Sequence, residues 1–529
     1  MFAKPYNPYL HSFASGALLS IAWPTYGFFP IIFIAFIPLL YVCEHFKNLS
    51  LFQIYRVSLF AFLIWNITTA WWICKYDFLG GSVVLMLNSM GMASVIWAYV
   101  ILKRKQILLK CGALGFISLW LSWEWIHQHW DLSWPWLNLG NVFANTPQII
   151  QWYEYTGVFG GSLWVLLVNW LIFESYKAIR GRVGKRIIVF NIVLTAIVIF
   201  VPITLSLTRY FSYVETNQPV KIAIIQQNTN PKAEQKDAFE DVINRRIIQL
   251  AQSVVDSNTS ILVCPESALL ETLSEENINS KKSILEIKKF SSLFPKLTMV
   301  IGGTTYQNAK NESSENNANT NSFLPYQKFN SALIIDSTDV IRFYHKSKLV
   351  PGVEEYPFKF ISIPLLKWLN NQDFEIKFSK ENNSKTFEIT DKSAKLGVVI
   401  CYESIYGEWI TSFVNDGASI IAIITNDGWW DNCDGYKQHL AYSRLRAIET
   451  RRTIARSANT GISAFINQRG DIIAQTSWNS AQTLNEVVNS NKFLTFYVKN
   501  GDYITRIANL ITIILGLLLA IKVIINKKR

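Results

Sequence analysis

Apolar residues follow two different patterns along the chain. Runs of about 20 apolar residues, the length that crosses the hydrocarbon core of a bilayer, occupy most of the sequence before residue 215 and after residue 503. Between these two positions the apolar runs are short and alternate with polar stretches. The pattern predicts a helical membrane bundle over 1–214, an α/β domain over 215–503 and a final span with a short basic tail over 504–529.

The long apolar runs predict about eight membrane-spanning helices. Their expected ranges are 10–28, 30–46, 53–73, 83–102, 112–129, 162–176, 187–208 and 505–525. Lys and Arg gather in alternate connections between these runs, as at Lys103–Lys105 and Arg180–Arg186. Because cytoplasmic loops carry the excess of Lys and Arg, we expect both termini in the cytoplasm and the region 215–503 on the outer side of the membrane.

Composition and charge support a membrane protein. Half of the residues are apolar and 17% are charged, against about 25% charged in a typical soluble domain. The net charge of +12 divides into +8 for residues 1–214, +5 for 504–529 and −1 for 215–503. The cations therefore follow the pattern of membrane topology. A nearly neutral middle region argues against a nucleic-acid-binding face, which needs a cluster of cations.

Short β-branched segments in the middle region predict a sheet covered by helices. These segments lie at 220–228, 261–269, 297–305, 330–336, 395–403 and 419–430. Apolar residues at helical spacing predict a helix over 438–452, and the segment 461–476 predicts a β-hairpin. The expected fold is thus a multi-pass α-helical membrane bundle joined to an extracytoplasmic α/β domain.

The six cysteines form no recognisable metal-binding pattern. The sequence contains no CxxC pair and no zinc-ligand spacing, so we expect neither a metal nor a cofactor. Cys264 and Cys433 could pair in an oxidising compartment or stay reduced. Cys401 ends an apolar segment, and strand ends are where α/β folds commonly expose reactive groups.

Polar residues at the ends of predicted strands form a candidate catalytic set. Glu266 lies within the segment 261–269, after its apolar start, Lys346 precedes Glu354 by eight residues, and Cys401 precedes Glu403 by two. A thiol with a pKa of about 8.5 is mostly protonated at neutral pH, so a nucleophilic cysteine needs a base nearby. A carboxylate can accept that proton, and an ammonium group can stabilise a thiolate and an oxyanion.

Glu, Lys and Cys in this order at strand ends resemble the nitrilase, or carbon–nitrogen hydrolase, superfamily. With the expected membrane spans, the chain is most specifically similar to the apolipoprotein N-acyltransferase family. Further matching motifs are Pro135–Gly140, Asn426–Trp429, Gln438–Glu449 and Asn459–Ser463. The resemblance covers essentially the whole chain and implies a nitrilase-like αββα sandwich in the periplasm.

The resemblance also implies roles for the candidate residues. Cys401 corresponds to the nucleophile, Glu266 to the general base and Lys346 to the third member of the triad. Glu354 and Glu403 match supporting positions in the family.

One segment departs from the family pattern. The family often has Leu-Val-Pro-Phe-Gly-Glu where this chain has Leu349-Val350-Pro351-Gly352-Val353-Glu354-Glu355. This leaves Glu355 as an alternative to Glu354, and Lys348 as an alternative to Lys346. The apolar stretch that follows, 356–368, is expected to be either a lid that contacts lipid or a segment packed on its own domain.

The implied activity is the last step of bacterial lipoprotein maturation in the inner membrane. An acyl chain would pass from a membrane phospholipid to a thioester on Cys401 and then to the N-terminal amino group of a diacylglyceryl-cysteine in an apolipoprotein. Nothing in the sequence requires more than a monomer. One alternative is a membrane-tethered amidase or nitrilase-type hydrolase that uses water as the acceptor. Another is a transporter or receptor with an inactive nitrilase-like outer domain.

Overall fold

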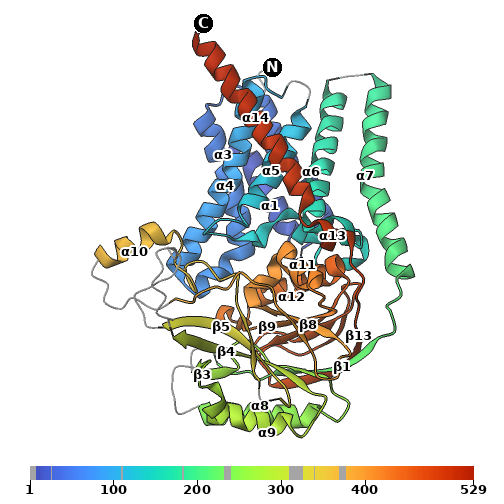
Figure 1. Cartoon of the computed structure of the whole chain (residues 1–529). Coiled ribbons are helices and arrows are strands. Elements are labelled where there is room, and N and C mark those ends of the chain that lie inside the picture. Colours follow the sequence, from blue (N-terminus) through green and yellow to red (C-terminus); the bar gives the residue numbers. More distant parts are fainter. Residues whose placement is uncertain are drawn as a thin grey trace. The chain divides into compact units, whose positions relative to one another are not determined.

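The computed structural model of the chain describes residues 7–25, 27–108, 111–181, 184–230, 240–308, 326–338, 340–368 and 377–528 (Figure 1). The chain divides into two compact units. One contains residues 1–213 together with 500–529, and the other contains residues 214–499. Each unit is considered separately below.

The first unit is built from helices. Its α-helices are α1 (Pro8–Ala22), α2 (Ile37–His45), α3 (Leu51–Ala70), α4 (Phe78–Arg104), α5 (Gly112–Ile126), α6 (Tyr153–Arg180), α7 (Lys185–Ser212) and α14 (Tyr503–Lys528). Its short 3-10 helices are η1 (Phe29–Ile34), η2 (Trp71–Lys75), η3 (Pro135–Leu137), η4 (Leu139–Phe143) and η5 (Pro147–Ile149). A helix thus lies at each of the eight ranges expected to span the membrane.

Five helical segments in the described part of the chain are long and apolar enough to cross a membrane. They correspond to α3 with η2, α4, α6, α7 and α14. The helices α1, α2 and α5 have 15, 9 and 15 residues, which is shorter than the roughly 20 residues that a perpendicular span needs. The count of about eight spans therefore stays a prediction.

Some polar side chains inside the helical unit pair with one another or with the backbone. Asn88 on α4 donates to Asn66 on α3 at 2.8 Å. Glu124, an acid inside an expected span, is buried. Its Oε1 accepts from the Trp120 indole at 3.0 Å and from the Leu139 N–H at 2.8 Å. These contacts give Glu124 a structural role, since it fixes the loop after α5 against the helix.

The second unit contains two sheets and their covering helices. Its strands are β1 (Pro219–Gln226), β2 (Ile261–Val263), β3 (Leu269–Ser274), β4 (Thr298–Asn308), β5 (Tyr326–Ile335), β6 (Arg342–His345), β7 (Thr386–Glu388), β8 (Lys395–Ile400), β9 (Ile420–Thr425), β10 (Thr453–Ala458), β11 (Ala464–Ile466), β12 (Ile472–Gln475) and β13 (Gln482–Asn489). Its α-helices are α8 (Glu240–Val254), α9 (Lys282–Ser291), α10 (Lys359–Trp368), α11 (Gly407–Asn415), α12 (Asp434–Thr450) and α13 (Phe496–Asn500). The 3-10 helices are η7 (Ile278–Ser280), η8 (Cys401–Ile405) and η9 (Asp427–Trp430).

The two sheets have different strand orders. Among the described residues, the first sheet has seven strands in the order β13-β1-β2-β4-β5-β6, with β3 paired to β4. The second has six strands in the order β12-β11-β10-β9-β8-β7. β1, β2 and β4 run parallel, as do β8, β9 and β10. The expected hairpin at 461–476 is the antiparallel pair β11–β12.

The alternation of side chains along the strands produces the layers. On β1, Ile222 and Ile224 belong to a core shared with the second sheet, whereas Ala223 and Ile225 belong to a core shared with α8 and α9. Successive strand residues point to opposite faces, so the first sheet is covered on both sides. The helices α11 and α12 pack on the second sheet (Figure 1). The result is the expected α–β–β–α arrangement of layers.

Candidate active site

Glu266 lies just after β2, at the carboxyl end of a strand in the first sheet. Its carboxylate is buried and accepts hydrogen bonds at both oxygens. Oε1 accepts from Lys346 Nζ at 3.2 Å and from Asn330 Nδ2 at 2.8 Å, and Oε2 accepts from the backbone N–H of Asn426 at 3.0 Å. A Cβ on Gly302 would lie 2.6 Å from the Glu266 Cα. Only glycine lets β4 pass this close to the turn that carries Glu266.

Lys346 follows β6 and is almost completely buried, with 1% of the residue exposed. Its ammonium lies between two carboxylates, since it also donates to Glu354 Oε1 at 2.9 Å. Burial lowers the pKa of Lys346, but the charges of Glu266 and Glu354 raise it by more, and the net effect is an increase. Lys346 is therefore a permanently charged group at neutral pH.

Asn330 completes this cluster from the neighbouring strand β5. Its amide donates to Glu266 and to Glu354, the latter at 2.9 Å. The backbone carbonyl oxygen of Asn330 accepts a hydrogen bond from the backbone N–H of Lys346 at 2.9 Å. The two carboxylates thus share one ammonium and one amide, which satisfies the charges that burial would otherwise leave uncompensated.

The structure separates the alternatives that the sequence left open at this position. Glu354 takes part in the cluster and also accepts from the Val350 N–H at 2.8 Å. Glu355 instead pairs with Lys380 at 3.2 Å. The Lys348 ammonium lies over the Tyr406 and Trp409 rings, 5.7 and 5.2 Å from their centroids. The geometry thus brings Lys346 and Glu354 to Glu266, whereas Lys348 and Glu355 have other partners.

Cys401 is the first residue after β8 and adopts a left-handed backbone conformation with φ of +50°. Such a φ is uncommon for a residue other than glycine, and it is found where surrounding contacts enforce it, often at active sites. Burial raises the pKa of the thiol well above its ordinary value, and the charge of Glu266 adds to this increase while Lys346 opposes it. The charges of both residues thus act on the thiol, with opposite effects on its pKa.

Glu403 lies two residues after Cys401 and accepts hydrogen bonds from four groups. The Tyr344 hydroxyl lies 2.8 and 2.9 Å from its two oxygens. The backbone N–H groups of Ser347, Lys348 and Ile400 donate to it at 2.6, 3.1 and 2.9 Å. Burial raises the pKa of Glu403, while the backbone donors lower it in part. Glu403 thus ties the segment that carries Lys346 to the strand that ends at Cys401.

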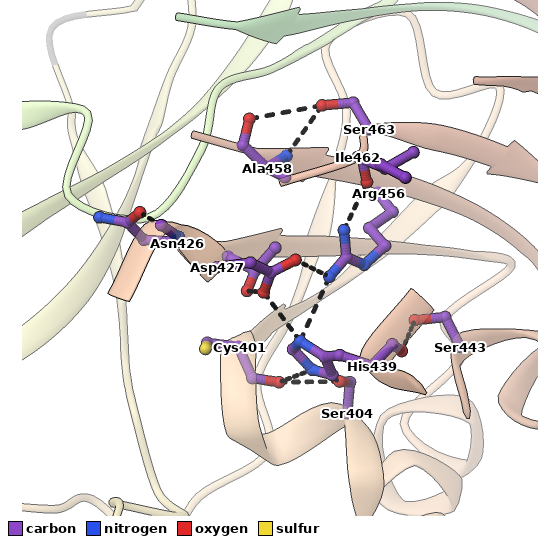
Figure 2. A network of polar contacts seen from close by, with 12 residues as sticks. Cys401, Ser404, Asn426, Asp427, His439, Ser443, Arg456, Ala458, Ile462 and Ser463 are labelled. Carbon is purple, nitrogen blue, oxygen red and sulfur yellow. Dashed lines mark hydrogen bonds and ion pairs between the residues drawn. The ribbon is translucent and has the colours of Figure 1, made fainter. Parts of the chain in front are cut away.

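A second polar network lies on the other side of Cys401 and was not assigned any role from the sequence. It contains Asp427, His439 and Arg456, all fully buried (Figure 2). Asn330 and Tyr344 were missed in the same way. The signal that could have found them is a polar residue within an otherwise apolar strand or buried helix, since a buried polar group must have a partner.

In the residues that the structure describes, no group of three or more His, Cys, Asp or Glu side chains could hold a metal ion. All six cysteines lie in the described ranges, and the structure has no disulfide bond between Cys264 and Cys433. Burial raises the pKa of Cys264 to about 12, which makes that thiol unreactive. A carboxylate, an ammonium and a strained cysteine together can perform nucleophilic acyl transfer.

Comparison with known protein families identifies two regions of the chain. The family model for the carbon–nitrogen hydrolases matches residues 221–491, slightly more than half of the chain. The model for the apolipoprotein N-acyltransferase N-terminal domain matches residues 15–171.

Individual relatives match the chain over nearly its whole length. The apolipoprotein N-acyltransferase of Chlorobaculum tepidum is 27% identical over 98% of this chain and 97% of its own length. The corresponding protein of Geobacter metallireducens is 26% identical over 94% of this chain and 93% of its own. Among solved structures, Nit3 of Saccharomyces cerevisiae, a nitrilase superfamily member, aligns with 53% of this chain and 92% of its own. The identity is 15% and the TM-score is 0.36.

Proposed function

Because the chain belongs to the carbon–nitrogen hydrolase family and carries an apolipoprotein N-acyltransferase N-terminal domain, we propose that it acylates the N-termini of bacterial lipoproteins. The observation that carries this proposal is the buried cluster of Glu266, Lys346 and Glu354 beside the strained Cys401. Such a cluster suits acyl transfer through a thioester, and the membrane domain gives access to acyl-chain substrates. This reaction is the last step of lipoprotein maturation.

In the first half of the proposed reaction, Cys401 attacks an acyl ester of a membrane phospholipid, at the sn-1 position. The thiol proton passes to Glu266 as the sulfur–carbon bond forms. Glu266 then returns the proton to the glycerol oxygen as the ester bond breaks. A lysophospholipid leaves, and the acyl chain remains on Cys401 as a thioester.

In the second half, the free α-amino group of a diacylglyceryl-cysteine attacks the thioester carbonyl. Glu266 accepts a proton from the amine and delivers it to the departing sulfur, which restores the thiol. The products are an N-acylated lipoprotein and free enzyme. The order of the two halves makes the reaction ping-pong.

The electrostatics of the cluster support these roles. Burial raises the pKa of the Cys401 thiol, so the thiol is protonated at rest and needs a base during attack. Lys346 stays charged between its two carboxylates and can stabilise the oxyanion of each tetrahedral intermediate. Glu354 holds that ammonium in place, the Asn330 amide fixes the two carboxylates, and Glu403 holds the backbone on both sides of the site.

The proposal includes a membrane topology. Residues 1–214 and 504–529 form the membrane domain with about eight spans, and residues 215–503 form the catalytic domain in the periplasm. Both termini then face the cytoplasm, in agreement with the position of the Lys and Arg clusters. The five long apolar helices support an inner-membrane protein. We propose a monomer, because the cluster is complete within one chain.

The segment 356–368 is proposed as an arm that contacts lipid. Its helix α10 exposes Phe360 to 76% and Ile361 to 57%, and large apolar residues with this exposure commonly mark a contact surface. The side chain of Leu365, expected to belong to the same surface, lies outside the described residues. A charged residue at Phe360 should slow acylation by phospholipid vesicles more than acylation by a soluble thioester donor.

The test is intact mass spectrometry of the purified chain incubated with a phospholipid of one defined acyl chain. We expect an added acyl mass that hydroxylamine removes and that Cys401→Ala abolishes. Cys111→Ala is the matched control, because Cys111 is an exposed thiol that would collect nonspecific acylation. The acyl mass should then move to a synthetic diacylglyceryl-cysteine peptide. Release as free fatty acid without transfer would favour the hydrolase alternative, and a Cys401→Ala chain that still acylates would refute the proposal.

A further inference from the structure

His439, on helix α12, lies against the backbone of the nucleophile. Its Nε2 is 3.2 Å from the carbonyl oxygen of Cys401 and 2.8 Å from the hydroxyl of Ser404. The Ser404 hydroxyl itself donates to the Cys401 carbonyl at 2.8 Å. The imidazole and the hydroxyl therefore converge on one carbonyl oxygen, that of the residue with φ of +50° (Figure 2).

The other side of the imidazole is fixed by a buried ion pair. Asp427 Oδ1 lies 3.0 Å from His439 Nδ1, and Asp427 Oδ2 accepts from Arg456 at 2.7 Å. The Arg456 Nη2 also lies 3.2 Å from Nδ1, and its other terminal nitrogen donates to the Ile462 carbonyl at 2.5 Å. All three charged or polar side chains are completely buried.

Tight packing leaves this ion pair no freedom to move. A Cβ on Gly461 would collide with the Asp427 carboxylate, so the turn after β10 is closed directly over it. The Thr425 hydroxyl donates to Asp427 Oδ1 at 2.9 Å. A buried ion pair adds little net stability compared with apolar residues of the same shape. Its role is then better explained by the geometry that it imposes.

The same loop also contacts the general base. Asn426, the residue before Asp427, donates its backbone N–H to Glu266 Oε2 at 3.0 Å. One short segment after β9 therefore touches Glu266 directly and touches Cys401 through His439. It connects a residue of the first sheet with a residue of the second.

We propose that His439, held by Asp427 and Arg456, is a positioning residue that keeps Cys401 in its left-handed conformation and in register with Glu266. Without the contact to its carbonyl, Cys401 relaxes toward the common region of φ. The sulfur then moves relative to the base and the ammonium. Misplacement of a reacting atom by about 1 Å can slow a reaction by about 100-fold. The inference deepens the proposed acyl transfer and rests on it, but its structural part can be tested without lipid.

The test compares His439→Gln with His439→Asn in the full-length chain. A Gln amide reaches the place of Nε2 and keeps a polar contact to Cys401 and Ser404. An Asn amide reaches only the place of Nδ1 and keeps the contact to Asp427. The matched control is Ser443→Ala, because the Ser443 hydroxyl donates to the His439 backbone carbonyl at 3.2 Å and does not enter the network.

Two rates are measured for each variant. The first is acyl-enzyme formation from a defined phospholipid, followed by intact mass spectrometry. The second is alkylation of Cys401 by iodoacetamide between pH 6 and pH 10, followed by peptide mapping. We expect His439→Asn to acylate about 100-fold more slowly than wild type and His439→Gln within about tenfold of it. We also expect the curve of Cys401 alkylation rate against pH to be displaced from that of wild type in His439→Asn. The curves of His439→Gln and Ser443→Ala should coincide with that of wild type.

The outcomes separate this inference from the proposed function. A wild-type chain that never acylates refutes the proposed function, whereas the alkylation profiles still decide the role of His439. Equal behaviour of His439→Gln and His439→Asn, in both rates, overturns the inference. If neither variant folds, Ser404→Ala replaces them. Loss of its hydrogen bond to the Cys401 carbonyl should slow acylation about three- to tenfold, and an unchanged rate overturns the inference.

Discussion

Replacement of Lys346 by methionine tests whether its ammonium holds two buried carboxylates. Methionine has a similar length and no charge, so Lys346→Met leaves Glu266 and Glu354 with only the Asn330 amide between them. Removal of one partner from a buried ion pair typically destabilises a protein by about 3–5 kcal/mol, because the remaining charge is uncompensated. We expect a loss of this size in the unfolding free energy of the 214–499 unit at pH 8.

The loss should depend on pH in a defined direction. Without the ammonium, two negative charges lie buried side by side in the folded variant, and uptake of one proton removes their repulsion, so folding of the variant favours proton uptake. Stability then increases as the pH falls, by about 1.4 kcal/mol per pH unit for one proton. In the wild type the raised pKa of Lys346 stabilises the fold below its unfolded pKa of about 10.4. That contribution is constant between pH 5 and pH 8. The difference in unfolding free energy between wild type and Lys346→Met should therefore narrow toward pH 5.

The assay uses Cys264, which is buried in the core of this unit with 0% exposure. Pulsed alkylation of Cys264 at increasing denaturant concentration, quantified by peptide mass spectrometry, reports opening of this unit alone. The matched control is Lys348→Met, because the Lys348 ammonium lies over the Tyr406 and Trp409 rings. A cation–π contact of this kind contributes about 0.5–1 kcal/mol.

The double variant Lys346→Met with Glu354→Gln provides a further check. It removes one of the two buried charges together with the ammonium, so it should recover part of the lost stability at pH 8 and show a smaller pH dependence. Suppose instead that Lys346→Met resembles Lys348→Met at every pH. The ammonium would then not compensate the carboxylates, and the electrostatic account of the site would be wrong.

Three further changes test the surroundings of the site by the same alkylation assay. Tyr344→Phe removes the hydroxyl that donates to both oxygens of Glu403 and should lower the unfolding free energy by about 1.5–3 kcal/mol; no change would show that the hydroxyl is dispensable. Burial raises the pKa of Asp427, but Arg456 and His439 together lower it by more, so its stabilising effect is complete above the unfolded pKa of about 3.9 and is lost progressively as the pH falls from there toward the lowered folded pKa. Asp427→Asn should be less stable than wild type at pH 7, with a difference in unfolding free energy that narrows steadily below about pH 3.9; a constant difference contradicts this sign. Gly397→Ala places a Cβ 2.8 Å from a side-chain carbon of Ile421 on β9. It should lower the unfolding free energy by about 1–3 kcal/mol and leave the acylation rate per folded molecule unchanged. An unchanged unfolding free energy would mean that the neighbouring side chains move aside without cost.

The positions of the candidate residues could be predicted because they follow a simple rule of α/β folds. Glu266 and Cys401 each come directly after a short apolar segment, and the structure has them after β2 and β8, both strands with parallel neighbours. Lys346 follows β6, which pairs antiparallel with β5. Strand ends are visible in a sequence, since apolar runs stop there. The residues at those ends can therefore be named before any contact is known.

Contacts between distant segments could not be predicted in this way. Asn330 is 64 positions from Glu266, and His439 is 38 positions from Cys401. Nothing in the local pattern distinguishes these residues from polar groups that face solvent. Their partners are set by which strands and helices become neighbours in the folded chain, which depends on tertiary structure. The lengths of α1, α2 and α5 are a similar case, because an apolar run gives the extent of a segment but not the residue at which its helix ends.

The site depends on both sheets because each sheet supplies some of its residues. Glu266 and Lys346 follow strands of the first sheet and Asn330 lies on one, whereas Cys401 and Asp427 follow strands of the second. The hydrogen bonds that join the two sheets at the site include two links: Glu403 binds backbone N–H groups on both sides, and the Asn426 N–H binds Glu266. A shift of one sheet relative to the other would separate the thiol from its base while each strand stayed intact. We therefore expect substitutions at these two links to reduce acylation before they unfold the domain, whereas substitutions in the core between the sheets should reduce both together.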